Sequence, residues 1–159
     1  MSIREMRWQD LGAVSALERE LHPDDAWSTA SWWAELALRP RRDYLVAQRA
    51  GSLVGYAGSD VSADRADVMT LAVAPPARGA GLAHLLLSEL HRRAADAGAR
   101  EMLLEVREDN AGARALYRRH GYRQVHRRAG YYRSEHGPVD ALLLSVPLPA
   151  APLERSARA

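Results

Sequence analysis

The stretch that most constrains the fold is residues 71–84, which read Leu-Ala-Val-Ala-Pro-Pro-Ala-Arg-Gly-Ala-Gly-Leu-Ala-His. An apolar run up to Val73 predicts a strand, and the double proline after it is rejected by strand and helix interiors alike. Two glycines follow, and an amphipathic run with apolar residues at helical spacing begins at Leu82. A strand, a glycine-rich turn and a helix in this order can hold a phosphate, because backbone N–H groups and the helix N-terminus supply donors.

Two common phosphate motifs fit this stretch poorly. A Walker loop requires a lysine after its last glycine, and the chain contains no lysine. A dinucleotide fingerprint requires a third glycine where His84 stands, and it would not begin so deep in the chain. The first motif is excluded and the second is a weak match.

A third pattern, Arg/Gln-x-x-Gly-x-Gly/Ala after an Ala-Val strand end, is met by Arg78, Gly81 and Ala83. It resembles the coenzyme A pyrophosphate loop of the GNAT acyltransferase superfamily. Taken alone, the motif leaves open an ordinary glycine-rich turn between a strand and a helix.

The periodicity of the chain predicts an α/β fold in which a mixed sheet of about seven strands is flanked by four helices. A polar connection is expected at residues 60–67, and Asp10, Ser28 and Asp109 or Asn110 are candidate helix N-caps. We expect one domain over residues 1–147 and a disordered tail over residues 148–159. The expected strands are 2–7, 44–47, 53–57, 68–73, 101–106, 122–128 and 139–146, and the expected helices follow Asp10, Ser28, Gly81 and Asn110.

Composition excludes several kinds of site. The chain has no cysteine, so thiol nucleophiles, disulfides and thiolate metal ligands are absent. Its histidines show no metal-ligand spacing, and we expect no metal; His84 and His91 share a helix face that we expect to meet solvent. The sequence shows no run of roughly 18 apolar residues and no signal peptide, which predicts a cytoplasmic protein with no membrane role.

Arginines concentrate between residues 107 and 133, where two interpretations compete. A basic cluster can be a nucleic-acid footprint. Alternatively, most of these arginines lie on solvated helix surfaces, and one or two contact coenzyme A phosphates. We favour this second interpretation over a direct nucleic-acid role. The arginines concerned are Arg107, Arg114, Arg118, Arg119, Arg123, Arg127, Arg128 and Arg133.

A second informative stretch spans residues 104–122. Glu105 stands in an apolar strand, where a carboxylate needs a partner or a function. Asn110 stands at a helix start, and Tyr117 follows two helical turns later, so both can face one groove. Gly121-Tyr122 then leads into the next strand.

This stretch, Glu-Val-Arg-x-x-Asn-x-x-Ala-x-x-Leu-Tyr-x-x-x-Gly-Tyr, is similar to the signature of the RimI family of bacterial ribosomal-protein-alanine N-acetyltransferases. The likeness covers nearly all of the chain before its tail, with departures at Ala26 for proline, Ala83 for glycine and Gly130 for asparagine, which bear on peptide specificity. Further matches are Ala26-Trp27-Ser28, Leu71-Ala72-Val73, and Tyr131-Tyr132 followed by Asp140-Ala141.

The resemblance implies a GNAT fold, in which the central mixed sheet is mostly antiparallel. It also implies acetyl-CoA as cosubstrate and assigns roles to residues. Glu105 would be the catalytic base and Tyr117 the acid, while the backbone N–H of Val73 would meet the oxyanion. Substrate-binding residues would be Trp27, Ser28, Tyr131 and Tyr132. The acetyl-CoA site would comprise Leu71, Ala72, Val73, Arg78, Gly79, Ala80, Gly81, Leu82, Ala83, His84 and Asn110.

The leading hypothesis is therefore Nα-acetylation of a protein N-terminus, that of ribosomal protein S18 if the likeness extends to the substrate. Acidic residues in expected loops, Asp24, Asp25, Asp60 and Asp64, would suit a basic acceptor peptide. Two alternatives remain open: a GNAT enzyme that acetylates a small amine or lysines, and a non-catalytic acyl-CoA-binding module. The sequence leaves the oligomeric state open.

Overall fold

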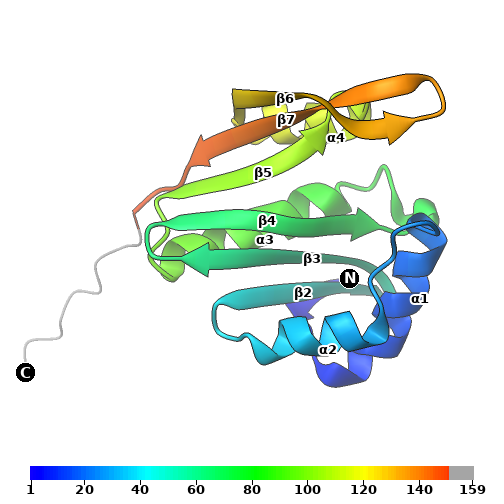
Figure 1. Ribbon diagram of the computed structural model, residues 1–159. Coiled ribbons are helices and arrows are strands. Elements are labelled where there is room, and N and C mark those ends of the chain that lie inside the picture. The colour runs from blue at the N-terminus through cyan, green and yellow to red at the C-terminus, as the bar shows by residue number, and fades with distance from the viewer. Residues whose placement is uncertain (151–159) are drawn as a thin grey trace, which may run out of the picture.

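A computed structural model describes residues 1–150, which form one seven-stranded mixed sheet with helices on both faces (Figure 1). The strand order is β1-β2-β3-β4-β5-β7-β6, and β4 with β5 is the one parallel pair of neighbours in this sheet. The expected mixed, mostly antiparallel sheet is confirmed. The strands are β1 (Ser2–Glu5), β2 (Arg42–Arg49), β3 (Ser52–Ser62), β4 (Arg65–Val73), β5 (Glu101–Arg107), β6 (Arg123–Ser134) and β7 (Gly137–Pro147).

Four α-helices cover the sheet in two layers. Helices α1 (Leu11–Leu21) and α2 (Thr29–Ala37) pack on one face, and α3 (Leu82–Asp96) and α4 (Ala111–Arg119) pack on the other. Short 3-10 turns, η1 (Trp8–Asp10) and η2 (Pro75–Ala77), precede α1 and the glycine-rich loop. No helix among residues 1–150 has the length and apolar character that crossing a bilayer demands.

The sheet has a hydrophobic core on each face. Apolar side chains of the strands supply both cores, because successive side chains point to opposite faces. On the α3 side, Leu86 and Leu90 pack with Leu104. On the α1 and α2 side, the fully buried Trp32 meets the rings of Tyr44 and Tyr56 edge-on, with centroids 5.5 Å away in each case. Both faces of the central strands are therefore buried, which makes the sheet a rigid base for its edges.

Strands β4 and β5 separate part-way along their length. They pair at three positions, Arg65 with Glu101, Ala66 with Met102 and Asp67 with Leu103, and the register between β3 and β4 then slips so that Met69 is an extra residue. A bulge bends its strand and ends regular pairing. The remainder of β4 therefore leaves β5 and presents an open backbone edge.

Three local expectations were wrong. Residues 60–67 do not form a polar connection: β3 and β4 extend through them and leave a turn at residues 63–64, with Ala66 fully buried. The last two strands are antiparallel neighbours as expected, but both are longer than predicted, which leaves only a short turn between them. Asp10 precedes α1 but does not cap it; its carboxylate instead accepts hydrogen bonds from Arg4 and from the backbone N–H of Arg7, each at 2.7 Å.

The expected tail lies mostly outside the described residues. Its first residue, Leu148, is buried, and its backbone N–H donates to the carbonyl of Arg100 at 2.8 Å. Packing of Leu148 therefore extends the folded part of the chain past residue 147.

Candidate active site

The glycine-rich loop between β4 and α3 has the backbone that a phosphate cradle needs. Gly79 and Gly81 adopt φ values of 77° and 75°, and Gly81 is the N-cap of α3. A Cβ atom at either glycine would meet nothing within 4 Å, so the backbone there is open to a ligand. Glycine takes this left-handed conformation without the strain that other residues pay. The first unpaired N–H groups of α3 add donors at the same place.

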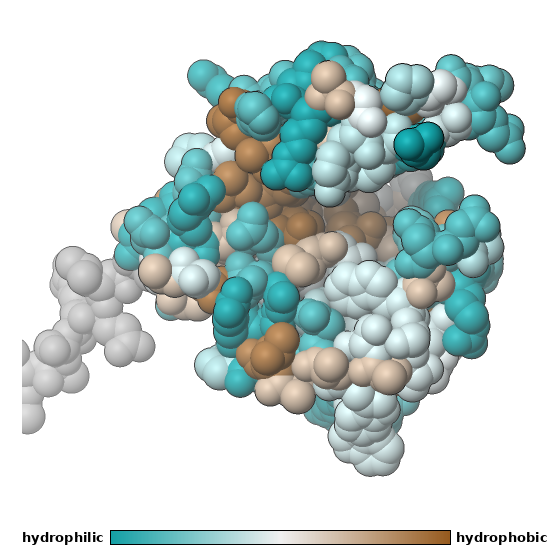
Figure 2. Space-filling model, viewed as in Figure 1, coloured by the Kyte–Doolittle hydropathy of each residue, from teal (hydrophilic) through white to brown (hydrophobic). Residues whose placement is uncertain are grey.

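A cavity of about 450 Å³ opens where β4 and β5 separate. Figure 2 shows the molecule hollowed between β4 and the part of the sheet that β5 and the β6–β7 hairpin form. The cavity brings together residues that lie far apart in the sequence: the end of β4, the loop and α4. Predicted residues in its lining are Leu71, Ala72, Val73, Arg78, Ala83, Asn110 and Tyr117.

The backbone of Val73 faces this cavity. The N–H of Ala74 donates to Val54 on β3 at 2.9 Å, so strand alternation turns the N–H and carbonyl of Val73 to the open edge. The carbonyl accepts from Nε of Arg78 at 3.1 Å, which holds that guanidinium beside the cleft. The N–H of Val73 is thus a rigid donor at the open end of the sheet, as the oxyanion role requires.

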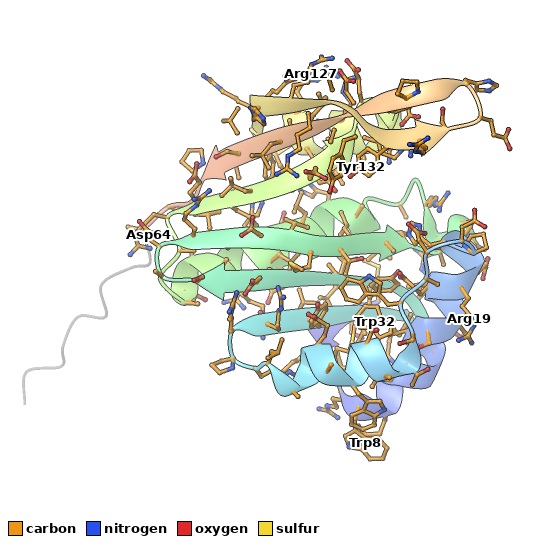
Figure 3. All side chains as sticks on the ribbon, viewed as in Figure 1. Trp8, Arg19, Trp32, Asp64, Arg127 and Tyr132 are labelled. Carbon is orange, nitrogen blue, oxygen red and sulfur yellow. The ribbon has the colours of Figure 1, made fainter. Side chains whose placement is uncertain are left out.

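Glu105 lies on β5 with its carboxylate partly buried, and two residues of β6 contact it. The phenol of Tyr132, which extends from the hairpin (Figure 3), donates to Oε1 at 2.9 Å, and Nη1 of Arg128 lies 3.4 Å from Oε2. Burial and the contact with Glu105 raise the pKa of Tyr132 to about 12. Tyr132 therefore remains a proton donor to the carboxylate, and Glu105 has the partners that a charge in an apolar strand needs.

Tyr117 and Asn110 hold the α4 side of the cleft. Tyr117 is 8% exposed, and burial raises the pKa of its phenol, so the hydroxyl stays protonated at neutral pH. The side-chain oxygen of Asn110 accepts from the backbone N–H of Ala113 at 3.0 Å and caps α4. Because this uses only the oxygen of Asn110, the amide NH₂ is left for a ligand.

The residues expected to bind substrate occupy different environments. Ser28 caps α2 by accepting from the backbone N–H of Ser31 at 3.0 Å. Trp27 packs on Trp32 with ring centroids 4.9 Å apart, so part of its surface belongs to the core. Tyr131 is 55% exposed beside Tyr132, and its ring lies 5.3 Å from the guanidinium of Arg128.

The remaining residues of the predicted acetyl-CoA site do not line the cavity itself. Leu82 is a core residue with its side chain 1% exposed, whereas Gly79, Ala80, Gly81 and His84 are exposed on the loop and the first turn of α3. Sequence reasoning missed Leu21, His22, Gly112, Ala113 and Leu116 in the lining. The helical spacing of Leu21 and Leu116 predicted only burial, and no sequence pattern indicated that the end of α1 reaches this cleft.

The histidines correct one expectation. His84 is exposed as predicted, but His91 is half-buried and its Nε2 lies 2.8 Å from the hydroxyl of Tyr122. Burial lowers the pKa of His91 to about 4, so it is neutral at physiological pH. Within residues 1–150 no three His, Cys, Asp or Glu side chains gather in a way that could hold a metal ion.

Several predicted surface charges are already paired. Arg127 contacts Glu108 at 2.8 Å and Asp140 at 2.7 Å, so this part of the arginine cluster is neutralised within the protein. Asp60 does not serve the site, because its carboxylate is bound by Arg41 and Arg42 at 2.7 and 2.9 Å. Asp24 and Asp25 are exposed just after His22, beside the cleft.

Comparison with known proteins gives a consistent result. The model of the acetyltransferase (GNAT) family matches residues 2–122. The N-alpha-acetyltransferase RimI of Mycobacterium tuberculosis is 40% identical over 129 residues, 78% of this chain and 79% of that protein. The [ribosomal protein bS18]-alanine N-acetyltransferase of Escherichia coli is 30% identical over 151 residues, 92% and 97% of the two chains. The crystal structure of the ribosomal-protein-S18-alanine N-acetyltransferase from Escherichia coli superposes with a TM-score of 0.85 at 27% identity, covering 96% of this chain and 97% of that one.

Proposed function

The chain belongs to the acetyltransferase (GNAT) family, and we propose that it transfers the acetyl group of acetyl-CoA to the N-terminal amine of a protein, the N-terminal alanine of ribosomal protein S18 in particular. The observation that carries the proposal is the carboxylate of Glu105, held by Tyr132 and Arg128 on the strand that bounds the open end of the sheet. The choice of acceptor rests on the names of the relatives, which describe N-terminal acetylation and the alanine of ribosomal protein S18. Such an acceptor would be met in the cytoplasm.

Acetyl-CoA fits the residues of the cleft. Gly79 and Gly81, with the N-terminus of α3, would receive the pyrophosphate. The open edge of β4 and the amide of Asn110 would hold the pantetheine arm, since both offer unpaired polar groups beside apolar side chains. A volume of about 450 Å³ suits the acyl end of this ligand, because small-molecule pockets are commonly about 300–1,000 Å³.

The choice of an α-amine as acceptor is consistent with a single carboxylate base. An amine attacks a thioester only when it is neutral, and a terminal α-amine has a pKa of roughly 7.7–8.0 against about 10.4 for lysine. Deprotonation at pH 7 therefore costs roughly 1 kcal/mol for the α-amine and about 4.6 kcal/mol for lysine. Glu105 can remove the remaining proton directly or through a water.

In the proposed reaction the amine and acetyl-CoA are bound together. The amine nitrogen forms a bond to the thioester carbonyl carbon, and its proton passes to Glu105. The carbonyl oxygen becomes an oxyanion that accepts from the N–H of Val73. The carbon–sulfur bond then breaks, and Tyr117 protonates the departing thiolate, which leaves an amide and free coenzyme A. No covalent acyl-enzyme is formed.

The test compares two peptides that differ in their amines. The first begins Ala-Arg and has a free N-terminus but no lysine; the second has the same sequence with a blocked N-terminus and one internal lysine. We expect acetyl-CoA turnover with the first peptide alone and its loss in Glu105→Gln. Turnover with the second peptide would move the acceptor to lysine. If neither peptide reacts while acetyl-CoA binds, the proposal fails, and a small amine or a binding role takes its place.

A further inference from the structure

The β6–β7 hairpin contains an irregularity directly above Glu105. Arg128 pairs with Ala141 and Tyr132 pairs with Val139, so residues 129–131 of β6 lie opposite the single residue Asp140 of β7. Extra residues on one strand form a bulge, which re-aims neighbouring side chains. Gly130 lies at its middle with a φ of 61°.

The side chain of Asp140 closes this bulge. One carboxylate oxygen accepts from the backbone N–H of Gly130 at 2.8 Å, and the other accepts from Nη1 of Arg127 at 2.7 Å. These two donors hold the pKa of Asp140 below its usual range, with the N–H of Gly130 the larger cause. The backbone of Asp140 is also bonded just beyond the end of β5, because its carbonyl accepts from the N–H of Glu108 at 2.9 Å.

The two residues that flank the bulge are the two that contact Glu105. Arg128 and Tyr132 are four residues apart on β6, and in a regular ladder their partners on β7 would also be four residues apart. The bulge instead brings these two residues opposite Ala141 and Val139, which are next-but-one neighbours on β7. Both side chains then point to the same face and reach across β7 to Glu105 on β5.

Ala141 provides the clearance for this reach. It lies between Arg107 of β5 and Arg128 of β6 in the register and is 1% exposed. A small side chain at this position leaves room for the longer side chains of β6 to pass over β7.

We propose that Asp140 is a positioning residue for the acetyl-transfer reaction: by closing the β6 bulge, it holds Tyr132 and Arg128 on the carboxylate of Glu105. This inference rests on the proposed function for the role of Glu105 as the base. It also explains the paired Asp140 and Ala141 of the sequence motif, neither of which is among the residues that line the cleft.

The principal experiment is a double-mutant cycle between Asp140→Ala and Tyr132→Phe, read as kcat and KM with the Ala-Arg peptide. We expect Asp140→Ala to lower kcat about tenfold, within the range found when a supporting contact of a site is lost, and to leave the KM for acetyl-CoA unchanged. If Asp140 acts through Tyr132, the two effects are not additive, and Asp140→Ala changes little in the Tyr132→Phe protein. Equal effects in both backgrounds would overturn the proposal.

Two further variants separate positioning from general stability. In Asp140→Asn the side-chain oxygen can still accept from the N–H of Gly130, so we expect most of kcat to return. Arg127→Ala removes the other partner of Asp140 but leaves the bond to Gly130, and we expect nearly full kcat. A large loss of kcat in Arg127→Ala, with Asp140→Asn as poor as Asp140→Ala, would contradict a role based on the Gly130 bond.

A measurement without catalysis distinguishes failure of this inference from failure of the proposed function. In protein labelled with ¹³C at the phenol carbon of tyrosine, the Tyr132 resonance is assigned by its absence in Tyr132→Phe. We expect this resonance to move in Glu105→Ala, which removes the acceptor of the Tyr132 hydroxyl, and to move similarly in Asp140→Ala, which releases Tyr132 from Glu105. If Asp140→Ala leaves it in place, Asp140 does not position Tyr132, whichever amine the enzyme acetylates.

Discussion

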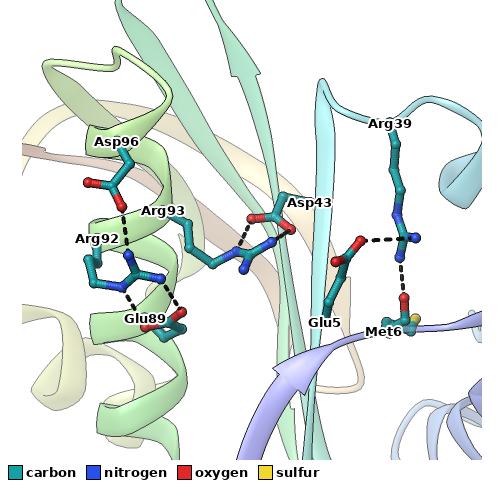
Figure 4. Close-up of polar contacts among 8 residues, drawn as sticks. All are labelled: Glu5, Met6, Arg39, Asp43, Glu89, Arg92, Arg93 and Asp96. Atoms are coloured by element: carbon teal, nitrogen blue, oxygen red, sulfur yellow. Dashed lines mark hydrogen bonds and ion pairs between the residues drawn. The ribbon is translucent and has the colours of Figure 1, made fainter.

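Two clefts of similar size differ in how their polar groups are partnered. The cavity at the separation of β4 and β5 measures about 450 Å³, and a second one between α3, β2 and the segment before β2 measures about 410 Å³. The second cleft is rich in charged residues, yet its charges are satisfied within the protein. Arg93 donates to both carboxylate oxygens of Asp43, at 2.5 and 2.8 Å, and Arg92 donates to both Glu89 and Asp96 (Figure 4).

The first cleft has the opposite character. Its polar groups include the backbone N–H of Val73 and the side-chain NH₂ of Asn110, and its loop contains glycines with open space beside them. Fixed donors that have no internal partner can bind a ligand without first breaking a bond. Under the proposed function, the unpaired and rigidly held donors distinguish the first cleft from the second, whereas volume does not.

The strongest effect on activity is expected at the base. Glu105→Gln keeps the shape of the side chain and removes its basicity, so we expect kcat to fall about 10³-fold, within the usual contribution of a general base. Glu101→Gln is the matched control, because Glu101 begins the same strand and bonds Ser145 instead. Steady-state kinetics with the free-amine peptide measure both. Comparable losses in the two variants would mean that Glu105 has no role beyond that of any carboxylate on β5.

Tyr117→Phe comes next. Loss of the hydroxyl removes the proposed acid, and we expect kcat to fall about 10²-fold while the free energy of unfolding changes little, since the ring remains. Tyr122→Phe serves as the control, because Tyr122 is equally buried but bonds His91. A drop in kcat for Tyr122→Phe as large as for Tyr117→Phe would argue for a packing effect.

The glycine loop yields a smaller effect on binding. Gly81→Ala places an L residue in a left-handed conformation, at a cost of roughly 1–2 kcal/mol, and disturbs the cradle; we expect the KM for acetyl-CoA to rise about tenfold. Gly98→Ala introduces the same kind of strain, at a φ of 104°, after the other end of α3. Urea unfolding should show similar destabilisation in both variants. If the KM for acetyl-CoA also rises in Gly98→Ala, the rise in Gly81→Ala would be due to lost stability and not to the cradle.

The weakest effect concerns the paired charges near the second cleft. Asp60 is 13% exposed, and its bonds to Arg41 and Arg42 hold its pKa below the usual range. The stabilisation that ionised Asp60 adds to the folded state is therefore fully present above the unfolded-state pKa of about 3.9. It is lost as the pH falls through the lower pKa of the folded state.

We expect Asp60→Asn to lower the free energy of unfolding at pH 7 by about 1 kcal/mol or less and to leave kcat unchanged. The difference from the parent protein should shrink when urea unfolding is repeated at pH 3. A difference that is equal at both values of pH would mean that the ion pairs do not account for the pKa of Asp60.

Local patterns in the sequence predicted the order of the helices and strands, though not all of their bounds, and seven of the twelve residues that line the cleft. They were sufficient for the phosphate loop, because proline ends a strand and only glycine adopts the backbone at positions 79 and 81 without strain. They also located Ser28 as a cap and narrowed the cap of α4 to Asp109 or Asn110, of which the structure has Asn110, since capping depends on neighbours three residues away. Motif likeness added Glu105, Tyr117 and the paired tyrosines.

How these residues meet depends on the folded chain as a whole. The bulge at Met69, the separation of β4 from β5, and the arrival of His22 at the cleft follow from pairing between distant strands and from packing of α1, which no local pattern encodes. The same holds for Asp60. The sequence analysis expected it in a loop, free to contact a basic acceptor peptide, but in the structure it lies in β3 and forms ion pairs with Arg41 and Arg42. Backbone conformation depends on adjacent residues and can therefore be predicted from a short stretch of sequence. The partner of a charged side chain depends on which strands are neighbours in the sheet, which only the tertiary structure determines.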